Sequence, residues 1–323
     1  MEKSYLSLFL HVWRETNFFR AILNARFQLR WLIYRKLRIE NFIRYYLNTD
    51  GRNTFFWVLY KNLYTPFLER SIGPGIDIMS EDWDNLVILD AYRSDYFEKF
   101  SRFEGEYKQV VSKGDHSHEF VKKNFSQKHW DLIVVTANVW YEKSPYTSEN
   151  TFFKLINPAS SRSKSHREVT EEAINQIENH PDKRLIIHYM SPHAPFEGEL
   201  AKKLVRPPWR DLYHMFTNNL INKHTLRQAY IETIEVIESE IEMLLPHLKG
   251  KTVITSDHGE NLGERQHCFT LHDHGNPSKE CRLVPWLVLE FNDRKELKSE
   301  NPEEYDVLNE SDVEKRLEYL GYK

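Results

Sequence analysis

The sequence predicts an α/β fold in which a mostly parallel central sheet is flanked by helices and preceded by a basic helical segment. From residue 85 onward, short apolar runs rich in β-branched residues alternate with polar stretches of helical period. Alternating strands and helices form a mostly parallel sheet, and runs without polar alternation are typical of strands buried on both faces. With 323 residues, of which 40% are hydrophobic, the chain is long enough for one large domain with appendages.

The first 70 residues differ from the rest of the chain in charge. They carry 12 Lys and Arg against 5 Asp and Glu, whereas the remainder carries 32 against 43. Across residues 17–47, arginines recur among Phe, Trp, Ile and Leu at three- and four-residue spacings, which predicts amphipathic helices with a cationic face. Such a face is suited to nucleic acid, an anionic membrane surface or an acidic partner; the alternative is that it stays in solvent while the apolar side packs on the main domain. We expect no nucleic-acid partner.

A domain boundary is predicted at Gly73, Pro74 and Gly75, because glycine and proline interrupt regular structure. We therefore expect a basic, aromatic, helical segment over residues 1–72 and an α/β domain over residues 73–323.

The cysteine content and the length of the apolar runs indicate the cellular compartment of the protein. Two cysteines, Cys268 and Cys281, are too few for a disulfide framework and match no zinc-binding spacing, which favours a reducing compartment. The apolar run Ser4–Trp13 is shorter than the roughly 20 residues that span a bilayer, and it lacks the basic flank and cleavage site of a secretory signal. We therefore expect no transmembrane helix and a cytoplasmic protein, with peripheral attachment to the membrane as the alternative.

The individual elements follow from the same two patterns. Six apolar runs predict strands at residues 85–91, 108–112, 131–137, 184–190, 251–257 and 284–290. Stretches of helical period between these runs predict helices at residues 94–100, 117–125, 169–180 and 225–248. The last stretch has an apolar residue at every third or fourth position from Leu226 to Leu244, so we expect one of its faces in the core.

Polar side chains stand where three of the predicted strands end. Asp90 closes the first run, His188 and His193 stand at the end of the fourth, and Asp257 and His258 close the fifth. Because the carboxyl ends of parallel strands share one edge of the sheet, we expect these side chains to converge. Carboxylate and imidazole ligands suit zinc or manganese, whereas calcium and magnesium prefer carboxylate and carbonyl oxygens. The pattern therefore predicts a divalent metal, with zinc or manganese ahead of calcium or magnesium.

Four motifs stand in a fixed order along the chain: VILDAYR, HYMSPHAPF, SDHGENLGE and HGNPSKECRLVPWLV. In this order they resemble the motifs of the alkaline phosphatase/sulfatase superfamily, in particular its sulfatase-like hydrolases. The chain is also similar to the phosphoethanolamine and phosphoglycerol transferases of that superfamily. The resemblance implies an alkaline phosphatase-like fold and metal-dependent hydrolysis or transfer of a phosphate or sulfate ester. The expected substrate is therefore an anionic ester, on a glycan or a lipid.

The resemblance also implies a nucleophilic hydroxyl at the start of the helix after the second strand. Ser117 fits best, because it stands directly before a helical stretch whose N-terminus attracts an anionic ester. The plain alternative is that Ser117 only caps this helix. Ser112 is the second candidate, at the strand exit, and Gly114 is expected to supply the turn between the two.

Metal ligands and proton donors are likewise implied by the resemblance. Asp90, Asp257 and His258 would hold one metal together with the Ser117 oxygen. His193 and His274, the latter from the fourth motif, would bind the ester oxygens and protonate the leaving group.

A second metal site is the alternative role for His193 and His274, and His188 is then the candidate third ligand. Arg93, three residues after Asp90, either binds an anionic substrate or pairs with Asp95. Glu260 and Glu264 are expected to be loop or cap residues.

One departure from the family bears on the substrate. Formylglycine sulfatases carry a Cys-or-Ser, x, Pro, x, Arg signature, whereas SHEFV at Ser117 has neither the proline nor the arginine. An unmodified serine favours phosphate chemistry.

The rival interpretation is a catalytically silent scaffold that docks on a membrane or partner through its N-terminal helices. Clustered buried carboxylates are costly unless they are paired or bind metal, and they therefore favour an enzyme.

Overall fold

The computed structural model describes residues 55–303, apart from 144–149, 159–163, 165, 207–210 and 267–268, and also Ser311 and Lys315. The sheet belongs to one compact unit, Lys61–Gln266 with Thr270–Lys323, hereafter the sheet unit. The basic helices expected within residues 17–47 lie outside the described residues. Helix α4 (Phe55–Ile72) ends directly before Gly73, and the division into domains after residue 72 stays a prediction.

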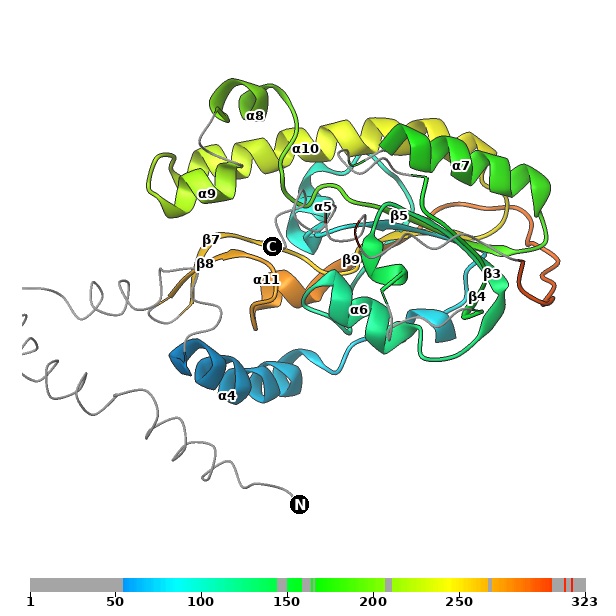
Figure 1. Ribbon diagram of the computed structural model, residues 1–323, viewed down its shortest axis with the longest axis horizontal. Helices are drawn as coiled ribbons and strands as arrows, with labels where there is room; N and C mark the ends of the chain where they lie inside the picture. Colours follow the sequence, from blue (N-terminus) through cyan, green and yellow to red (C-terminus); the bar gives the residue numbers. More distant parts are fainter. Residues whose placement is uncertain are drawn as a thin grey trace, which may run out of the picture. The chain divides into compact units, whose positions relative to one another are not determined.

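Seven strands form the central sheet, in the order β2-β9-β6-β1-β5-β3-β4. Their bounds are β1 (Asn85–Leu89), β2 (Glu106–Val111), β3 (His129–Thr136), β4 (Phe152–Ile156), β5 (Arg184–Tyr189), β6 (Thr252–Thr255) and β9 (Leu283–Val288). β1 pairs in parallel with β5 and β6, and β3 pairs in parallel with β4 and β5. The sheet is therefore mostly parallel and lies between helices, which confirms the predicted fold class (Figure 1).

β9 runs antiparallel to both of its neighbours, β2 and β6. The short helix α11 (Lys279–Arg282) leads directly into it, so the chain enters β9 at the edge where the parallel strands end. The loop before α11, which contains His274, therefore lies at that same edge. The sequence predicts this strand but not its direction, because an apolar run carries no information about direction.

Three strands are not predicted by the sequence. β4 is a short edge strand, and β7 (Asn261–Gln266) and β8 (Phe269–Asp273) form a separate two-stranded sheet. The residues of β7, NLGERQ, are largely polar. Strands without a long apolar run escape a search based on apolar runs.

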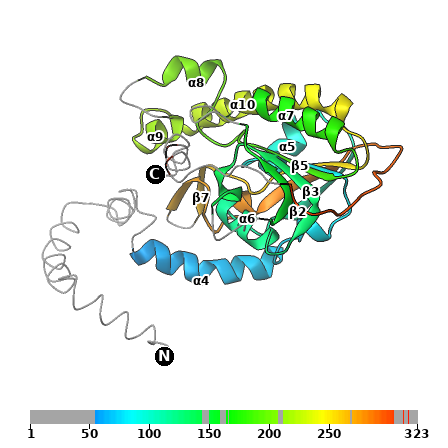
Figure 2. The ribbon, with the colours of Figure 1, turned by 45° about the vertical axis from the view of Figure 1, so that its right-hand side comes forward.

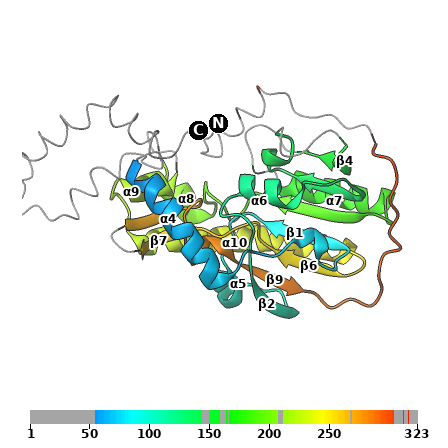
Figure 3. The same cartoon turned by 90° about the horizontal axis from the view of Figure 1, so that it is seen from below.

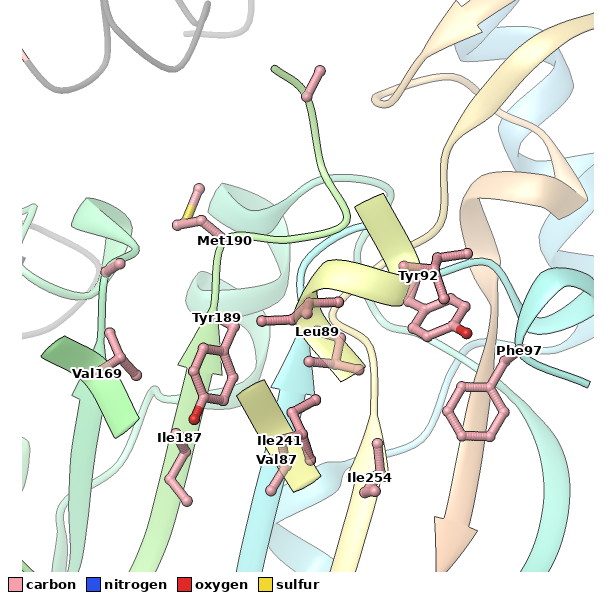
Figure 4. Close-up of a cluster of buried hydrophobic side chains, with 14 of the residues drawn as sticks. Val87, Leu89, Tyr92, Phe97, Val169, Ile187, Tyr189, Met190, Ile241 and Ile254 are labelled. Atoms are coloured by element: carbon pink, nitrogen blue, oxygen red, sulfur yellow. The ribbon is translucent and has the colours of Figure 1, made fainter. Parts of the chain in front are cut away.

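The strands of the main sheet are buried on both faces, as their apolar runs predict. In β1, Val87 and Leu89 belong to one apolar cluster, and Leu86 and Ile88 belong to another. Successive side chains of a strand point to opposite faces, so the two clusters lie on the two sides of the sheet. Figure 4 shows the first cluster, in which residues of β1, β5 and β6 meet Ile241 of helix α10 (Lys223–Leu244).

Helices cover both faces of the sheet (Figures 1 and 2). The helices that contribute to the first cluster are α5 (Ser94–Phe100), α7 (His166–Asn179), α8 (Glu199–Leu204), α9 (Leu212–Thr217) and α10 (Lys223–Leu244). Helix α6 (Ser117–Asn124) packs Phe120 and Val121 into the second cluster. Within the described ranges, every helix is either too short or too polar to span a lipid bilayer.

After β9 the chain continues as an extended strap, residues 289–303, along the opposite end of the sheet (Figure 3). Arg294 pairs with Asp84, directly before β1, at 2.6 Å between Nε and Oδ2. The backbone N–H of Lys298 donates to the carbonyl of Asp182, before β5, at 2.9 Å. The strap thus ties together the amino ends of the strands, away from the edge at which they end.

Candidate functional site

Side chains from three connections meet at the carboxyl edge of the sheet. Asp90 follows β1, Ser117 begins α6 after β2, and Asp257 and His258 follow β6. All four residues are fully buried. The fold therefore brings together the four residues that the sequence analysis assigned to one metal site.

Ser117 is held between two members of this group. Its Oγ donates a hydrogen bond to Oδ2 of Asp90 at 3.1 Å and lies 3.3 Å from Nε2 of His258. His116, not Ser117, is the residue that precedes the helix, and its side chain makes no capping hydrogen bond. The Ser117 hydroxyl therefore faces the site and does not cap the helix. The first turn of α6 adds backbone N–H groups and a positive dipole end, which favour an anionic ligand.

Each carboxylate of this group keeps one buried oxygen whose charged neighbours within 4.0 Å, among the described residues, are histidines. Oδ1 of Asp90 and Oδ2 of Asp257 accept no hydrogen bond from the described residues, and Nε2 of His258 lies 3.3 and 3.4 Å from these atoms. Burial works against ionisation of Asp90, but His258 and His193 outweigh it and hold the Asp90 pKa below its ordinary value. Burial also opposes the charged imidazole, yet Asp257 and Asp90 raise the pKa of His258 to about 10.

Backbone amides orient Asp257. Its Oδ1 accepts hydrogen bonds from the N–H groups of Ala91 at 3.2 Å and of His258 at 2.8 Å, which leaves Oδ2 turned to the site. Ala91 has a φ of 63°, a left-handed backbone that residues other than glycine rarely adopt. This turn directly follows Asp90. Local backbone strain is thus part of what holds the two carboxylates in place.

A second group of ligand-type side chains adjoins the first. His193, Glu260, Asp273 and His274 each place one nitrogen or oxygen within 4.8 Å of the others. Nε2 of His193 lies 3.0 Å from Nδ1 of His274 and 4.0 Å from Oε1 of Glu260. The ring centroids of His274 and His258 are 4.9 Å apart, so the two groups form one continuous site.

Three residues of this site, Glu260, Asn138 and Asp273, are not predicted by the sequence; Asp273 ends β8 and belongs to the second group. Glu260, expected to be a loop or cap residue, is fully buried, and burial raises its pKa to about 8. Asn138 donates from Nδ2 to Oδ2 of Asp90 at 3.2 Å, the same oxygen that accepts from Ser117. Asn138 directly follows a predicted strand, so the strand-exit argument extended to that run would have found it. Glu260 carries no such signal, because an acidic loop residue is usually exposed.

His188 adjoins the first group rather than the second. Its Nε2 lies 3.7 Å from Oδ2 of Asp257, and its Nδ1 lies 3.1 Å from the hydroxyl of Tyr141. The fold therefore places it on the Asp257 side of the site, apart from the pair formed by His193 and His274.

Arg93 has two carboxylate partners. Its Nη2 lies 2.7 Å from Oδ2 of Asp95, and its Nη1 lies 2.7 Å from Oε1 of Glu264, a residue of β7. The ion pair with Asp95, one of the two roles considered from the sequence, is thus formed. A role of Arg93 in substrate binding stays a prediction.

The hydroxyl of Ser112, the second candidate nucleophile, hydrogen-bonds to two backbone groups. Its Oγ donates to the carbonyl of Asp257 and accepts a hydrogen bond from the N–H of Gly114 at 3.1 Å. A Cβ on Gly114 would come within 2.6 Å of the backbone nitrogen of Phe120, so only glycine lets this loop approach α6 so closely. The geometry therefore favours Ser117 over Ser112 as the reactive hydroxyl.

The first group has the composition of a divalent cation site. Asp90, Asp257 and His258 each offer one ligand atom within 4.8 Å of the others. Two of those atoms are the buried carboxylate oxygens without hydrogen bonds, an arrangement that a bound cation would stabilise. Two carboxylates, one imidazole and a neighbouring hydroxyl suit zinc or manganese.

Comparisons with known proteins identify one matching family model and several similar solved structures. The family model described as Sulfatase matches residues 90–307. The soluble domain of lipooligosaccharide phosphoethanolamine transferase A from Neisseria meningitidis is 14% identical, with a TM-score of 0.43, over 64% of this chain and 76% of that one. The integral membrane form of that transferase is 15% identical, with a TM-score of 0.46, over 86% of this chain and 64% of that one. Phosphonate monoester hydrolase of Agrobacterium radiobacter is 11% identical, with a TM-score of 0.37, over 63% of this chain and 67% of that one. No curated protein matches the chain by sequence.

Proposed function

This chain belongs to the sulfatase family, and we propose that it is a metal-dependent enzyme that hydrolyses or transfers phosphate esters with Ser117 as nucleophile. The observation that carries this proposal is the position of the Ser117 hydroxyl. Its Oγ contacts both Asp90 and His258 inside a fully buried group, in which one oxygen of each carboxylate accepts no hydrogen bond from the described residues.

The residues around Ser117 supply what a serine nucleophile requires. Asp90, Asp257 and His258 would hold a divalent ion, which would lower the pKa of the neighbouring Ser117 hydroxyl and offset the negative charge of the ester. Asn138 donates to Oδ2 of Asp90 and so holds the oxygen that orients the Ser117 hydroxyl. The N-terminus of α6 favours the negative charge of the phosphoryl group.

The second group is suited to the leaving group. Ser117 Oγ passes its proton to Oδ2 of Asp90, its hydrogen-bond acceptor, and bonds to phosphorus as the bond to the leaving oxygen breaks. His193 or His274 donates a proton to the leaving oxygen. Water or an acceptor hydroxyl then takes the phosphoryl group from Ser117. Water makes the enzyme a hydrolase, and a sugar or lipid hydroxyl makes it a transferase.

Phosphate is the proposed ester because the formylglycine signature is missing. The residues after Ser117, HEFV, lack the proline and arginine that accompany the modified residue in formylglycine sulfatases. An unmodified hydroxyl, oriented by Asp90, is suited to attack on phosphorus.

We propose that the substrate is lipid-linked or a surface glycan, and that the enzyme meets it at an anionic membrane surface. The net positive first 70 residues include most of α4, in which Leu63 and Phe67 are 70% and 62% exposed and stand one turn apart. Cationic and apolar side chains of this kind suit the surface of an anionic bilayer.

A panel of esters tests the proposal. Purified protein is supplied with zinc or manganese and offered p-nitrophenyl phosphate, bis(p-nitrophenyl) phosphate and p-nitrophenyl sulfate. We expect metal-dependent release of nitrophenol from a phosphate ester and little from the sulfate. Metal bound at the site with no turnover of any ester, with or without an added acceptor alcohol, would favour the silent scaffold instead.

A further inference from the structure

A buried lysine that the proposed chemistry does not use lies beside His193. Lys164, between β4 and α7, is only 4% exposed. Its Nζ donates to Oγ of Ser191 at 2.9 Å and to the backbone carbonyl of His193, and it lies 3.5 Å from Oε2 of Glu197. An ammonium group has three N–H donors, and three acceptors surround this one.

The contacts of Lys164 enclose His193 along the chain. Ser191 and Glu197 stand on either side of it, and Oγ of Ser191 donates to Oε2 of Glu197 at 2.7 Å. Lys164 therefore joins both ends of the turn 191–197 to the carbonyl at its centre. The N–H of His193 donates in turn to the carbonyl of Asp90 at 2.9 Å, which ties the turn to the exit of β1.

Burial of a charged amine restricts the conformations available to its partners. An ammonium taken out of water costs several kcal/mol unless its donors are met. Burial accordingly lowers the pKa of Lys164, while the charge of Glu197 opposes this change. Because the three acceptors compensate the charge only when they surround Nζ together, Lys164 favours one conformation of the turn.

We propose that Lys164 is a positioning residue that holds the turn 191–197 so that the imidazole of His193 faces His274 and Glu260. Nε2 of His193 lies 3.0 Å from Nδ1 of His274 and 4.0 Å from Oε1 of Glu260 in that orientation. The expected effect of Lys164 on turnover rests on the proposed function, whereas its expected effect on the orientation of the His193 imidazole does not.

Lys183 offers a matched control. It is 1% exposed, and its Nζ donates to the carbonyl of Lys298 at 2.9 Å and pairs with Oε2 of Glu300 at 2.6 Å. A backbone carbonyl and a glutamate thus accept from it, as they do from Lys164. Lys183 stands directly before β5, at the opposite edge of the sheet from the site.

Histidine-ring NMR on the full-length protein without added metal tests the position of His193. The ring signals of His193 and His274 are identified by their loss in His193→Gln and His274→Gln. We expect Lys164→Met to shift both signals and Lys183→Met to leave both in place. Unchanged signals in Lys164→Met, or equal shifts in the two lysine variants, would overturn the proposal. Should Lys164→Met not fold, Ser191→Ala removes one acceptor and takes its place.

Turnover of bis(p-nitrophenyl) phosphate is the second measurement, made at a temperature where both variants stay folded. We expect Lys164→Met to lower kcat by about 10- to 100-fold with a smaller change in KM, and Lys183→Met to stay within about twofold of the wild type. Lys164→Arg, which keeps the charge, should recover part of the loss. Equal losses of kcat in Lys164→Met and Lys183→Met would show that Lys164 contributes only to stability. Wild-type protein without turnover would contradict the proposed function, while the ring signals would still decide the role of Lys164.

Discussion

Oγ of Ser117 lies 3.1 Å from Oδ2 of Asp90, although 27 positions separate the two residues in the chain. The same oxygen accepts from Asn138, while Oδ1 of Asp90 has no hydrogen-bond donor among the described residues. One carboxylate thus accepts from the serine with one oxygen and faces Nε2 of His258 at 3.3 Å with the other. This division of the two oxygens underlies the first two predictions.

Removal of the nucleophile should abolish turnover. Ser117→Ala takes away the atom that forms the bond to phosphorus, so kcat should fall by several orders of magnitude. Ser112→Ala is the matched control, because Ser112 Oγ makes only backbone contacts and its loss should cost about 1 kcal/mol of stability with kcat retained. Steady-state rates on an aryl phosphate check both. The reverse ranking would move the nucleophile to Ser112, and small effects in both would favour direct attack by water.

Loss of the ligands should remove the metal. Asp257→Asn combined with His258→Ala takes away two of the three ligand-type side chains of the first group. We expect metal content, measured by elemental analysis after dialysis, to fall by at least one ion per chain. Asp115→Asn is the control, since Asp115, His116 and Glu119 form a similar group outside the proposed site. Full occupancy in the double variant would show that the ion binds elsewhere.

In metal-free protein, Glu260 should make stability fall as pH rises. Its pKa is raised from 4.5 to about 8 by burial, so between these values the folded state holds a proton that the unfolded state has lost. The contribution to stability is therefore complete below about pH 4.5 and is lost as pH rises through about 8. Urea titrations at several pH values, with a chelator present, should show a flatter pH dependence in Glu260→Gln. Parallel curves for the two proteins would contradict a buried, protonated Glu260.

The strap should contribute to stability without affecting chemistry. Arg294 donates to Asp84, which is fully buried and would lose a charged partner in Arg294→Ala. Because the Arg294 side chain is 41% exposed, solvent screens the pair, and we expect a loss of about 2 kcal/mol. Thermal unfolding measures this change, with exposed Arg167→Ala as the control. An unchanged Tm would show that the strap binds the strand ends by its other contacts.

Vesicle co-sedimentation tests the proposed membrane surface. Binding should rise with the anionic lipid fraction and fall with salt, which screens charge over roughly 8 to 10 Å. Leu63→Ser with Phe67→Ser should weaken binding, whereas Leu220→Ser, a change at another exposed leucine, should not. A full-length protein indifferent to lipid would contradict the membrane setting and leave the ester chemistry untouched.

Local patterns in the sequence determined the fold class and the chemical character of the site. The run VILD predicts both a buried strand and a carboxylate at its exit, because burial and strand end are visible within a few residues. The four ordered motifs indicated the superfamily, which the family match confirms.

Tertiary structure decided which further side chains join the four that the sequence analysis assigned to one metal site, and how each of them is oriented. The direction of β9 brings His274 to the strand ends, and a choice between Ser117 and Ser112 depends on which way each hydroxyl points. Glu260 and Lys164 are polar residues whose burial follows only from the packing of distant segments around them. Whether a polar side chain is buried, and which atoms it hydrogen-bonds, depends on contacts between residues far apart in the chain, and for that reason no local pattern predicts these two properties.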